Sequence, residues 1–338
     1  MGFQVRALQR HELDDFLICF QAAFGVDDPS LSIIRNSLVN DPYFHPEKVR
    51  VGVLDGEIIS HVVVLERPAW AGKQVITTAG ITAVATHPYY QGKGFGTRVM
   101  QDALKLIRRR PYDLALITTR VPGFFARLGF EEVPAVIGYQ SPASALARVE
   151  VTDEYEIHRL DYHEQWPIIA DIYREYSQLR TGMQVREERF WESWPVRGTF
   201  PIGFSSELGS LGMIATQENR MVAYLAAQLL PEMPHLSITE CAHLNDHADA
   251  MLALLKATAE RYIQTGGRRI VMITGGHAPV LKLIEAQGVP IEADTGQGLM
   301  VMVTNKKWIR PAGFRNVRDA IQNLFFSEIP VLWHRDGY

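Results

Sequence analysis

The sequence predicts a mixed α/β protein made of two tandem domains, each about 150 residues long. Three observations support this fold class. The order of strands and helices in the first half recurs in the second half. A stretch rich in small residues, 141–153, separates the halves. A glycine-rich turn stands directly before an amphipathic helix in the first half. The 338 residues are ample for two hydrophobic cores.

Hydrophobic periodicity defines the elements of the first half. Alternating and β-rich runs predict strands, including a hairpin turning at Asp55-Gly56, over residues 3–8, 48–70, 73–88 and 112–119, and the stretch 131–140 closes the unit near residue 145. Apolar residues at helical spacing predict helices over residues 10–25, 26–42, 97–109 and 122–130.

The second half repeats this order. Strands are expected at 155–160, 210–230 (a hairpin turning at Glu218-Asn219), 237–244, 268–275 and 298–305, and helices at 163–178, 246–266 and 278–289. We interpret this order as an internal duplication with domains at 1–145 and 151–305. The tail, 306–338, has one expected helix over 315–325. The tail is rich in bulky apolar residues and too short for a core of its own, so we expect it to pack on one of the domains.

Composition narrows the classes of function. The net charge is −4, from 34 basic and 38 acidic residues, which favours neither nucleic-acid binding nor a polybasic membrane anchor. Cys19 and Cys241 are too few for a disulfide framework or a cysteine zinc site, so a reducing compartment is expected. No signal peptide and no run of about 18 apolar residues is recognised, so we expect a cytoplasmic protein. The residues do not specify an oligomeric state.

The glycine-rich turn before the helix at 97–109 is the main functional signal. The first N–H groups of a helix lack intrahelical partners and the helix dipole is positive there, so an anion is stabilised. Gly92, Gly94 and Gly96 let the backbone approach such an anion closely. The spacing does not match a P-loop. It also fails the dinucleotide fingerprint, whose third glycine would fall at Thr97.

The sequence Gln-Gly-Lys-Gly-Phe-Gly at 91–96 fits the Q/R-x-x-G-x-G/A pattern of the GCN5-related N-acetyltransferase (GNAT) superfamily. The stretches AGITAVATHP (79–88) and FFARLGFEEV (124–133) are similar to the acyl-CoA strand and the FYxxxGF segment of that family. The resemblance covers residues 3–145. The paired layout also resembles the enhanced-intracellular-survival class of acetyltransferases, although those proteins carry a larger third domain where this chain has a short tail.

The resemblance implies an acetyl transfer from acetyl-CoA to a primary amine on a small molecule or peptide, with no metal. The CoA pyrophosphate would bind to the backbone of Gln91, Gly92, Lys93, Gly94, Phe95, Gly96 and Thr97. The pantetheine arm would pair with Val84, Ala85 and Thr86 on a strand that splays from its neighbour, where one N–H would polarise the thioester carbonyl. Phe124 and Phe125 would wall the thiol end.

The chain departs from the family at the proton donor. A tyrosine that protonates the leaving thiolate commonly stands at the position of Phe125, so another acid, water, or positioning alone would have to serve. Three groups are candidates for the catalytic base: Asp28 (with Asp27 beside it), His87, and the carboxylate of Tyr338. Capping of a helix by the aspartates and a turn role for His87 are the alternatives.

The second half lacks the glycine loop, and Asp246 and Asp249 stand at the equivalent helix start, so no CoA is expected there. His243 and His247 have the i, i+4 spacing of a metal pair, but Leu244 replaces the glutamate of H-E-x-x-H, so we expect no metal. Two hypotheses follow. The chain is an N-acetyltransferase, or it is a non-catalytic acyl-CoA-binding regulatory or scaffold protein. Residues proposed to line the acceptor cleft are His61, Arg67, Trp70 and the segment 27–45.

Overall fold

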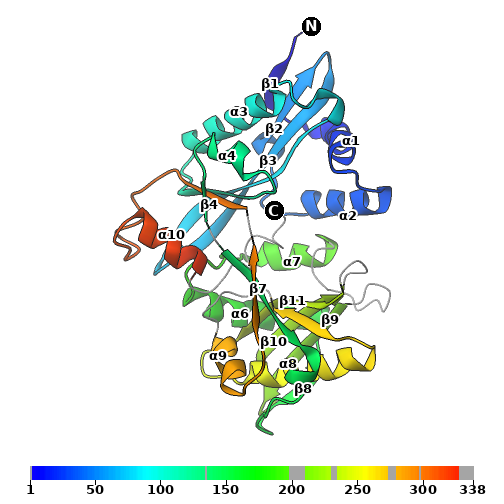
Figure 1. Cartoon of the computed structure of the whole chain (residues 1–338), viewed down its shortest axis with the longest axis vertical. Coiled ribbons are helices and arrows are strands. Elements are labelled where there is room, and N and C mark those ends of the chain that lie inside the picture. Colours follow the sequence, from blue (N-terminus) through cyan, green and yellow to red (C-terminus); the bar gives the residue numbers. More distant parts are fainter. Residues whose placement is uncertain are drawn as a thin grey trace.

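A computed structural model describes residues 2–133, 135–197, 210–229, 234–272, 279–296 and 298–326. The chain forms two seven-stranded sheets. Figure 1 shows them in separate halves of an elongated molecule, each sheet with helices packed against it. The mixed α/β class and the two tandem units predicted from sequence are therefore confirmed.

The first sheet carries its strands in the order β1 (Gln4–Ala7), β2 (Val49–Leu54), β3 (Glu57–Ala71), β4 (Gln74–Thr86), β5 (Leu114–Thr118), β14 (Leu299–Val303) and β6 (Glu131–Glu132). Neighbouring strands are antiparallel except β4 and β5, which are parallel. The β2–β3 hairpin turns at Asp55 and Gly56, both with positive φ, which gives the strands their expected tight connection.

The second sheet has the order β13 (Glu292–Gly296), β7 (Ala135–Pro142), β12 (Arg269–Met272), β11 (Leu236–His243), β10 (Arg220–Leu229), β9 (Ser210–Gln217) and β8 (Glu156–Arg159). Among the described strands of this sheet, β11 and β12 are the one parallel pair. Read from β8, the order repeats that of the first sheet from β1, and the β9–β10 hairpin turns at Glu218 and Asn219 with positive φ.

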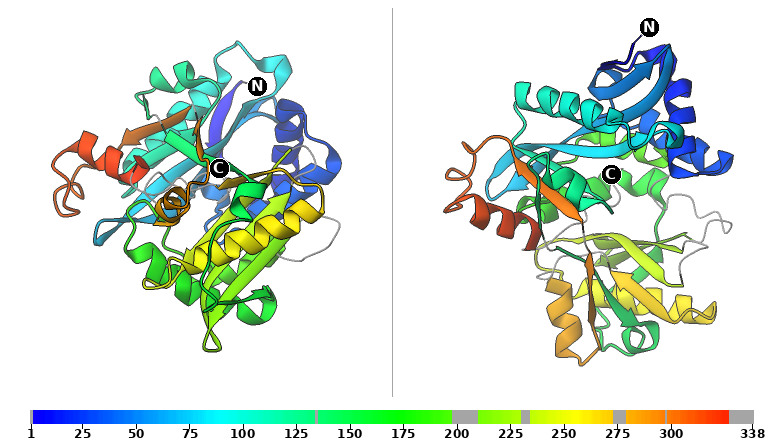
Figure 2. Two further views of the ribbon diagram at one scale, coloured as in Figure 1. Left: turned by 60° about the horizontal axis from the view of Figure 1, so that its bottom comes forward. Right: turned by 45° about the horizontal axis from the view of Figure 1, so that its top comes forward.

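Two strands lie in the sheet of the opposite half. β14, from the second half of the chain, pairs with β5 and β6 of the first sheet, and β7, from the first half, pairs with β12 and β13 of the second. This exchange was not predicted from the sequence. The chain crosses between the two halves of the molecule at these strands, as Figures 1 and 2 show.

Helices cover both faces of the first sheet. Those on one face are α1 (Leu13–Phe24) and α2 (Asp28–Val39), and those on the other are α3 (Phe95–Arg109) and α4 (Pro122–Ala126). The apolar face predicted for α3 is the buried one, formed by Val99, Met100, Ala103, Leu104 and Ile107. Short 3-10 turns complete this half: η1 (Arg10–Glu12), η2 (Pro46–Lys48) and η3 (Pro88–Tyr90).

The second sheet packs with α5 (Ala143–Leu146), α6 (Tyr162–Gln178), α7 (Glu188–Arg197), α8 (Ala250–Gln264) and α9 (Pro279–Ala286). The elements α5, α7 and β13 were not predicted. In the tail, Trp308, Phe314 and Leu324 share a core with strands β3, β4, β5 and β14 of the first sheet, and Leu324 lies on α10 (Val317–Phe326). The domain limits expected at residues 145, 151 and 305 stay a prediction.

The two halves meet along the far end of β3. The Trp70 N–H donates to the Met183 carbonyl at 2.8 Å, and the Gly182 N–H donates to the Trp70 carbonyl at 2.7 Å. The Val185 N–H reaches the Pro68 carbonyl at 2.8 Å. This backbone pairing ties the segment between α6 and α7 directly to the first sheet.

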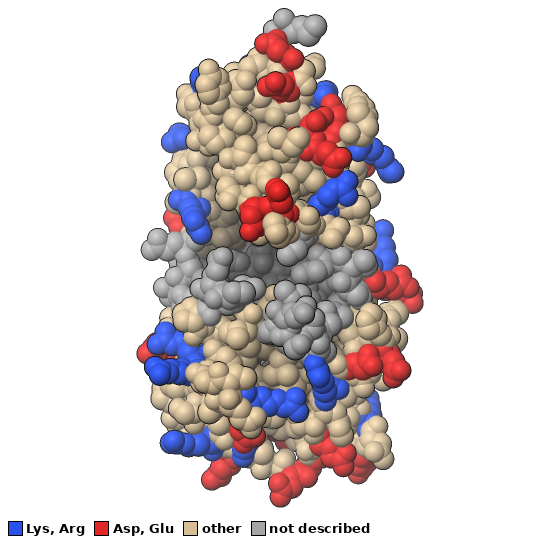
Figure 3. Space-filling model, turned by 90° about the vertical axis from the view of Figure 1, so that its right-hand side faces the viewer, with Lys and Arg blue, Asp and Glu red and all other residues tan. Residues whose placement is uncertain are grey.

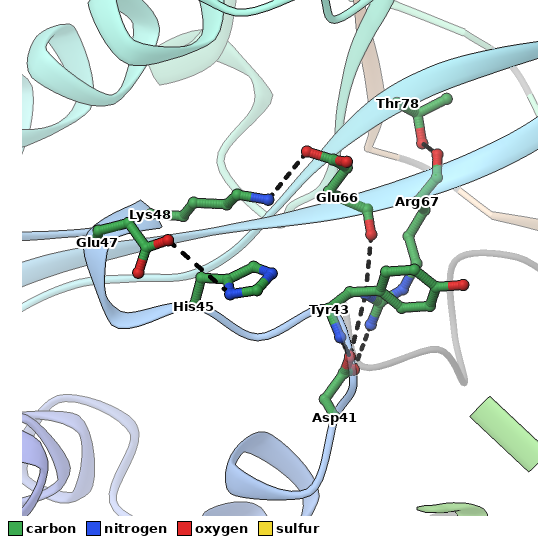
Figure 4. Close-up of polar contacts among 8 residues, drawn as sticks. All are labelled: Asp41, Tyr43, His45, Glu47, Lys48, Glu66, Arg67 and Thr78. Carbon is green, nitrogen blue, oxygen red and sulfur yellow. Dashed lines mark hydrogen bonds and ion pairs between the residues drawn. The ribbon is translucent and has the colours of Figure 1, made fainter. Parts of the chain in front are cut away.

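A buried ion pair lies beside this contact (Figure 4). The guanidinium of Arg67, on β3, is fully buried and bonds to the Asp41 carboxylate, which also accepts from the Tyr43 N–H at 2.8 Å. The Tyr43 ring contacts the guanidinium groups of both Arg67 (5.1 Å) and Arg189 of α7 (5.0 Å), and it joins the core of the second half. Lys48 pairs with Glu66 nearby at 2.9 Å.

The face of the molecule in Figure 3 carries basic and acidic side chains interspersed over both halves. Within the part of the chain that the structure describes, no helix has the length and apolar character required to cross a membrane.

Candidate active site

The parallel strands β4 and β5 separate at their carboxyl ends. Their pairing covers Thr78 to Gly80 on β4, opposite Leu114 to Leu116 on β5, and stops there although β4 runs on to Thr86. The other edge of β4 stays paired with β3 as far as Thr86. The edge of residues 81–86 that faces β5 therefore has backbone groups with no β5 partner in the ladder, as the sequence analysis expected of a splayed strand.

The glycine turn follows directly. Its Gly92 and Gly94 have φ of 75° and 81°, in the left-handed region that glycine adopts without steric cost. Gly94 is the residue before α3, whose 15 residues provide a helix dipole directed at the turn. The Gln91 side-chain amide donates to the Thr86 carbonyl at 3.0 Å, which fixes the turn to the end of β4.

A cleft with a volume of about 950 Å³ lies between the separated strands. A smaller hollow of about 340 Å³ lies over the glycine turn, and the two share Thr86, Gln91, Gly96 and Phe124 in their linings. The size of the cleft is within the range of small-molecule and cofactor sites. Together the two form one surface from the strand edge to the start of α3.

Most of the residues predicted to bind acetyl-CoA line this surface. The cleft is lined by Val84, Ala85, Thr86, Gln91, Gly96, Phe124 and Phe125, and the hollow by Gly92, Gly94, Phe95 and Thr97. Lys93 is not among the described lining residues, and its ammonium lies over the rings of Tyr89 (4.9 Å) and Tyr90 (5.4 Å). The binding roles of these residues stay a prediction.

Phe125 is almost fully buried, at 2% exposure. Its ring meets those of Phe124 (4.9 Å) and Phe130 (5.9 Å) nearly at right angles. It supplies no proton at the cleft, and its contacts are those of a packing residue.

The candidate bases have other partners in the structure. Asp27 caps α2 by accepting from the Ser30 N–H at 2.8 Å, and hydrogen bonds from Ser30 lower the pKa of its carboxyl. Asp28 accepts from the Gln21 amide at 2.7 Å. His87 Nδ1 accepts from the Tyr89 N–H at 3.3 Å. Tyr338 lies outside the described residues, and the catalytic roles of Asp28, His87 and Tyr338 stay predictions.

Several lining residues were not predicted. They are Phe20, Phe24 and Val26 from α1 and the loop after it, and Thr119, Arg120 and Val121 after β5. Of the residues expected in the acceptor cleft, His61 and Arg67 are fully buried and are not among the described lining residues. The signal available in the sequence was the apolar stripe of the first helix, which includes Phe20 and Phe24, and the structure leaves Phe24 half exposed at the cleft.

Comparison with known proteins identifies the family. A family model described as an acetyltransferase (GNAT) domain matches residues 4–133, which include the separated strands and the glycine turn. This part of the chain, residues 4–133, belongs to the GNAT superfamily. No curated protein sequence matches the chain with statistical significance.

Solved GNAT structures share this fold across both halves of the chain. A GCN5-related N-acetyltransferase from Anabaena variabilis matches with a TM-score of 0.71 at 15% identity, over 90% of this chain and 73% of that one. Eis1 from Mycobacterium abscessus matches with a TM-score of 0.65 at 15% identity, over 92% of this chain and 75% of that one. A tandem GNAT protein from the clavulanic acid biosynthesis pathway matches with a TM-score of 0.55 at 13% identity, over 90% of this chain and 99% of that one.

In the second GNAT-like unit, the described residues at the corresponding place line a small hollow. The described pairing of β11 with β12 covers Leu236 to Ile238 and Ile270 to Met272, and the hollow beside it, lined in part by Glu240 and Cys241, holds about 10 Å³. At the start of α8, the Tyr155 hydroxyl donates to Asp249 at 2.7 Å. A carboxylate and a tyrosine thus occupy the position where the first GNAT domain has bare glycines.

The histidine pair of the second unit has separate partners. The His243 ring is buried against Tyr176 at 5.0 Å, whereas the His247 ring packs against Tyr155 at 6.2 Å. Among the residues that the structure describes, no cluster of three or more His, Cys, Asp or Glu side chains could hold a metal ion.

Proposed function

We propose that the chain is an N-acetyltransferase that transfers the acetyl group of acetyl-CoA to a primary amine at the cleft of its first GNAT domain. The single observation that carries this proposal is the continuity of the cleft. The free edge of β4 at residues 81–86 leads directly to a bare glycine turn at the start of a 15-residue helix.

The residues present fit acetyl-CoA. The hollow over Gly92 and Gly94 offers helix N–H groups and the positive end of a dipole, which suit a pyrophosphate. The unpaired edge of β4 offers alternating N–H and C=O groups, which suit the amides of a pantetheine arm. The aromatic rings of Phe124 and Phe125 would wall the thiol end.

In the proposed reaction the amine nitrogen attacks the thioester carbonyl carbon, and the C–N bond forms as the C–S bond breaks. The amine loses one proton and the thiolate gains one, so an amide and free CoA leave the site. A backbone N–H on β4 would stabilise the oxyanion. Asp28, His87 or the Tyr338 carboxylate would take the proton of the amine, directly or through water.

A non-catalytic acyl-CoA-binding role is the second candidate, and Phe125 is the observation that favours it. A buried phenylalanine at this position leaves the cleft without the proton donor expected there. Acetyl transfer remains our proposal, because proximity alone contributes several kcal/mol and a thiolate leaves without prior protonation more readily than an alkoxide.

The test combines turnover with a matched pair of variants. Thiol release from acetyl-CoA is followed with a thiol dye over a panel of primary amines, and release that requires both protein and amine is expected. Gly94→Asp places a negative charge at the pyrophosphate, whereas Gly94→Asn has the same shape without the charge, and both residue types tolerate the left-handed φ of 81°.

Calorimetry should then show acetyl-CoA binding lost in Gly94→Asp and weakened much less in Gly94→Asn, whose side chain narrows the turn but adds no negative charge. Tight binding without amine-dependent release over the whole panel would support the non-catalytic candidate. Equal affinity of the Gly94→Asp variant and the wild-type protein would remove the site assignment altogether.

A further inference from the structure

The splayed end of β4 contains a bulge with unusual backbone geometry. His61 of β3 pairs with Ala85 and Val63 pairs with Thr82, so Ala83 and Val84 together lie opposite one residue of β3. Ala83 has a φ of 48°, in the left-handed region that L-residues other than glycine rarely adopt. Such a conformation is strained and persists only where its surroundings impose it.

His61 supplies the interaction that holds this bulge. Its side chain is fully buried, and its Nδ1 lies 2.6 Å from the Ala83 carbonyl oxygen. A carbonyl only accepts hydrogen bonds, so Nδ1 carries the proton and donates it. Nε2 then keeps its lone pair, and it has no hydrogen-bond partner among the described residues.

The unpaired Nε2 means that a histidine at position 61 must be favoured by another interaction of its ring. A buried acceptor without a partner is unfavourable, and a phenylalanine or leucine would fill the space without that penalty. The bond from Nδ1 to the bulge is the interaction of the ring that an apolar side chain would not replace.

His61 also supports a second part of the cleft wall. Its ring is stacked on Phe20 at 5.9 Å with an interplanar angle of 14°, and it lies 4.6 Å from the Phe16 ring. Phe20 and Ala83 both line the cleft. The imidazole therefore lies directly behind the lining, out of reach of solvent, and contacts two elements of it.

We propose that His61 is a positioning residue that fixes the peptide between Ala83 and Val84 in the orientation needed for acetyl transfer. The carbonyl and N–H of a planar trans peptide point in opposite directions. A carbonyl held toward His61 therefore directs the Val84 N–H away from it. This N–H, on a residue that lines the cleft, is the donor that would meet the thioester carbonyl oxygen.

This inference rests on the proposed acetyl transfer, and its test compares three substitutions. In His61→Asn the side-chain nitrogen is bonded directly to Cγ, as Nδ1 is in histidine. The asparagine can therefore still donate a hydrogen bond to the Ala83 carbonyl. His61→Gln moves the nitrogen one bond further, and His61→Leu removes it. Kinetics of amine-dependent thiol release and calorimetry with acetyl-CoA are measured for each.

We expect kcat to fall by about 10- to 100-fold in the Leu and Gln variants, since loss or displacement of one oxyanion donor has effects of this order. Asn should restore most of kcat. The Kd for acetyl-CoA should change by less than about threefold in all three, because the glycine turn is untouched. Wild-type kcat in the Leu variant, or equal loss in Asn and Leu, would overturn the proposal.

Nitrogen-15 NMR of the wild-type imidazole gives a readout that does not depend on activity or on variants that fold. A proton on Nδ1 of neutral His61 at pH 7 is expected, and a proton on Nε2 would refute the assignment. If the wild-type protein releases no thiol with any amine, the proposed function fails, while the NMR result still decides whether His61 holds the bulge.

Discussion

A methyl group on Gly96 would lie 2.9 Å from the hydroxyl oxygen of Thr86, so the first turn of α3 is pressed against the end of β4. Ser60 holds that hydroxyl from the other side, with the two oxygens 2.9 Å apart. The strands β3 and β4 and the helix α3 thus meet at Thr86, and they leave no room for a side chain on Gly96.

Gly96→Ala should therefore weaken acetyl-CoA binding by about tenfold, because the helix start must shift by some tenths of an ångström. Thr86→Ala removes the obstructing hydroxyl, so the double variant should recover most of the affinity. Calorimetry on the wild-type protein, the two single variants and the double variant measures this coupling. Independent, additive effects would contradict the close contact.

Phe125→Tyr should keep or raise kcat if the reaction lacks a proton donor. Phe125 lines the cleft, so a hydroxyl at the tip of its ring would be added near the thiol end. The Phe124→Tyr variant is the matched control, since it adds the same hydroxyl to the neighbouring ring. Steady-state thiol release compares the two. A large loss of kcat in Phe125→Tyr alone would instead mark the ring as essential packing.

His61 should make the protein less stable in acid. Burial lowers the pKa of His61 to about 4 from an ordinary value of 6.5, although the hydrogen bond to Ala83 partly opposes this. Between these two pH values His61 binds a proton in the unfolded chain but not in the folded chain. The free energy of unfolding therefore decreases as the pH is lowered from 6.5 to 4. The loss should reach about 3 kcal/mol at pH 4 and vanish above pH 7.

Urea unfolding at a series of pH values measures this effect against His61→Asn, which does not titrate. The other titrating groups are common to both proteins and cancel in the difference. A difference between the two proteins that does not change from pH 7 to pH 4 would show that His61 is not held neutral.

Asp41→Ala should destabilise the protein by about 3–5 kcal/mol, because it removes the carboxylate that neutralises the buried Arg67 guanidinium. Asp41→Asn keeps an acceptor for the guanidinium and for the Tyr43 N–H, so its loss should be smaller. Thermal and urea unfolding measure both. A loss below about 1 kcal/mol in the Ala variant would mean that the pair contributes little to the contact between the halves.

Gly298→Ala should damage the cleft although residue 298 belongs to the second half of the chain. Gly298 has a φ of 88°, and a methyl group on it would lie 1.8 Å from the carbonyl oxygen of Thr119, which lines the cleft. Gly266→Ala is the control, since its φ of 84° is similar but nothing lies within 4 Å. The control should lose about 1–2 kcal/mol of stability.

The Gly298 variant should lose more stability than the control, and it should also lose acetyl-CoA affinity. Urea unfolding and calorimetry provide the two measurements. Equal stability losses in the two variants would indicate that the contact with Thr119 gives way easily.

Local patterns in the sequence were sufficient for much of the fold. The amphipathic spacing over 97–109 predicted α3, observed at Phe95–Arg109, because a helix is defined by neighbours three and four residues away. The glycine turn was equally visible for the same reason. The exchange of β7 and β14 could not be predicted from the sequence, because an apolar run such as Leu299–Val303 does not indicate which distant strand it will pair with.

The same limit applied to the site. The residues of the turn are contiguous, so one motif identified them together. Phe20 reaches the cleft only because α1 packs across the sheet, and His61 lies behind the bulge only because β3 and β4 shift register there. The role of His61 depends on the backbone angle φ of Ala83, which no residue spacing in the sequence encodes.

The strand exchange also has a consequence for how the polypeptide reaches its native state during synthesis. The first sheet lacks its sixth strand until residue 303 has been synthesised, and β7 lacks both of its partner strands until β12 and β13, within residues 269–296, have been synthesised. Neither sheet can close before nearly the whole chain has emerged, so partly made chains would expose an open strand edge, and such non-local pairing is slow.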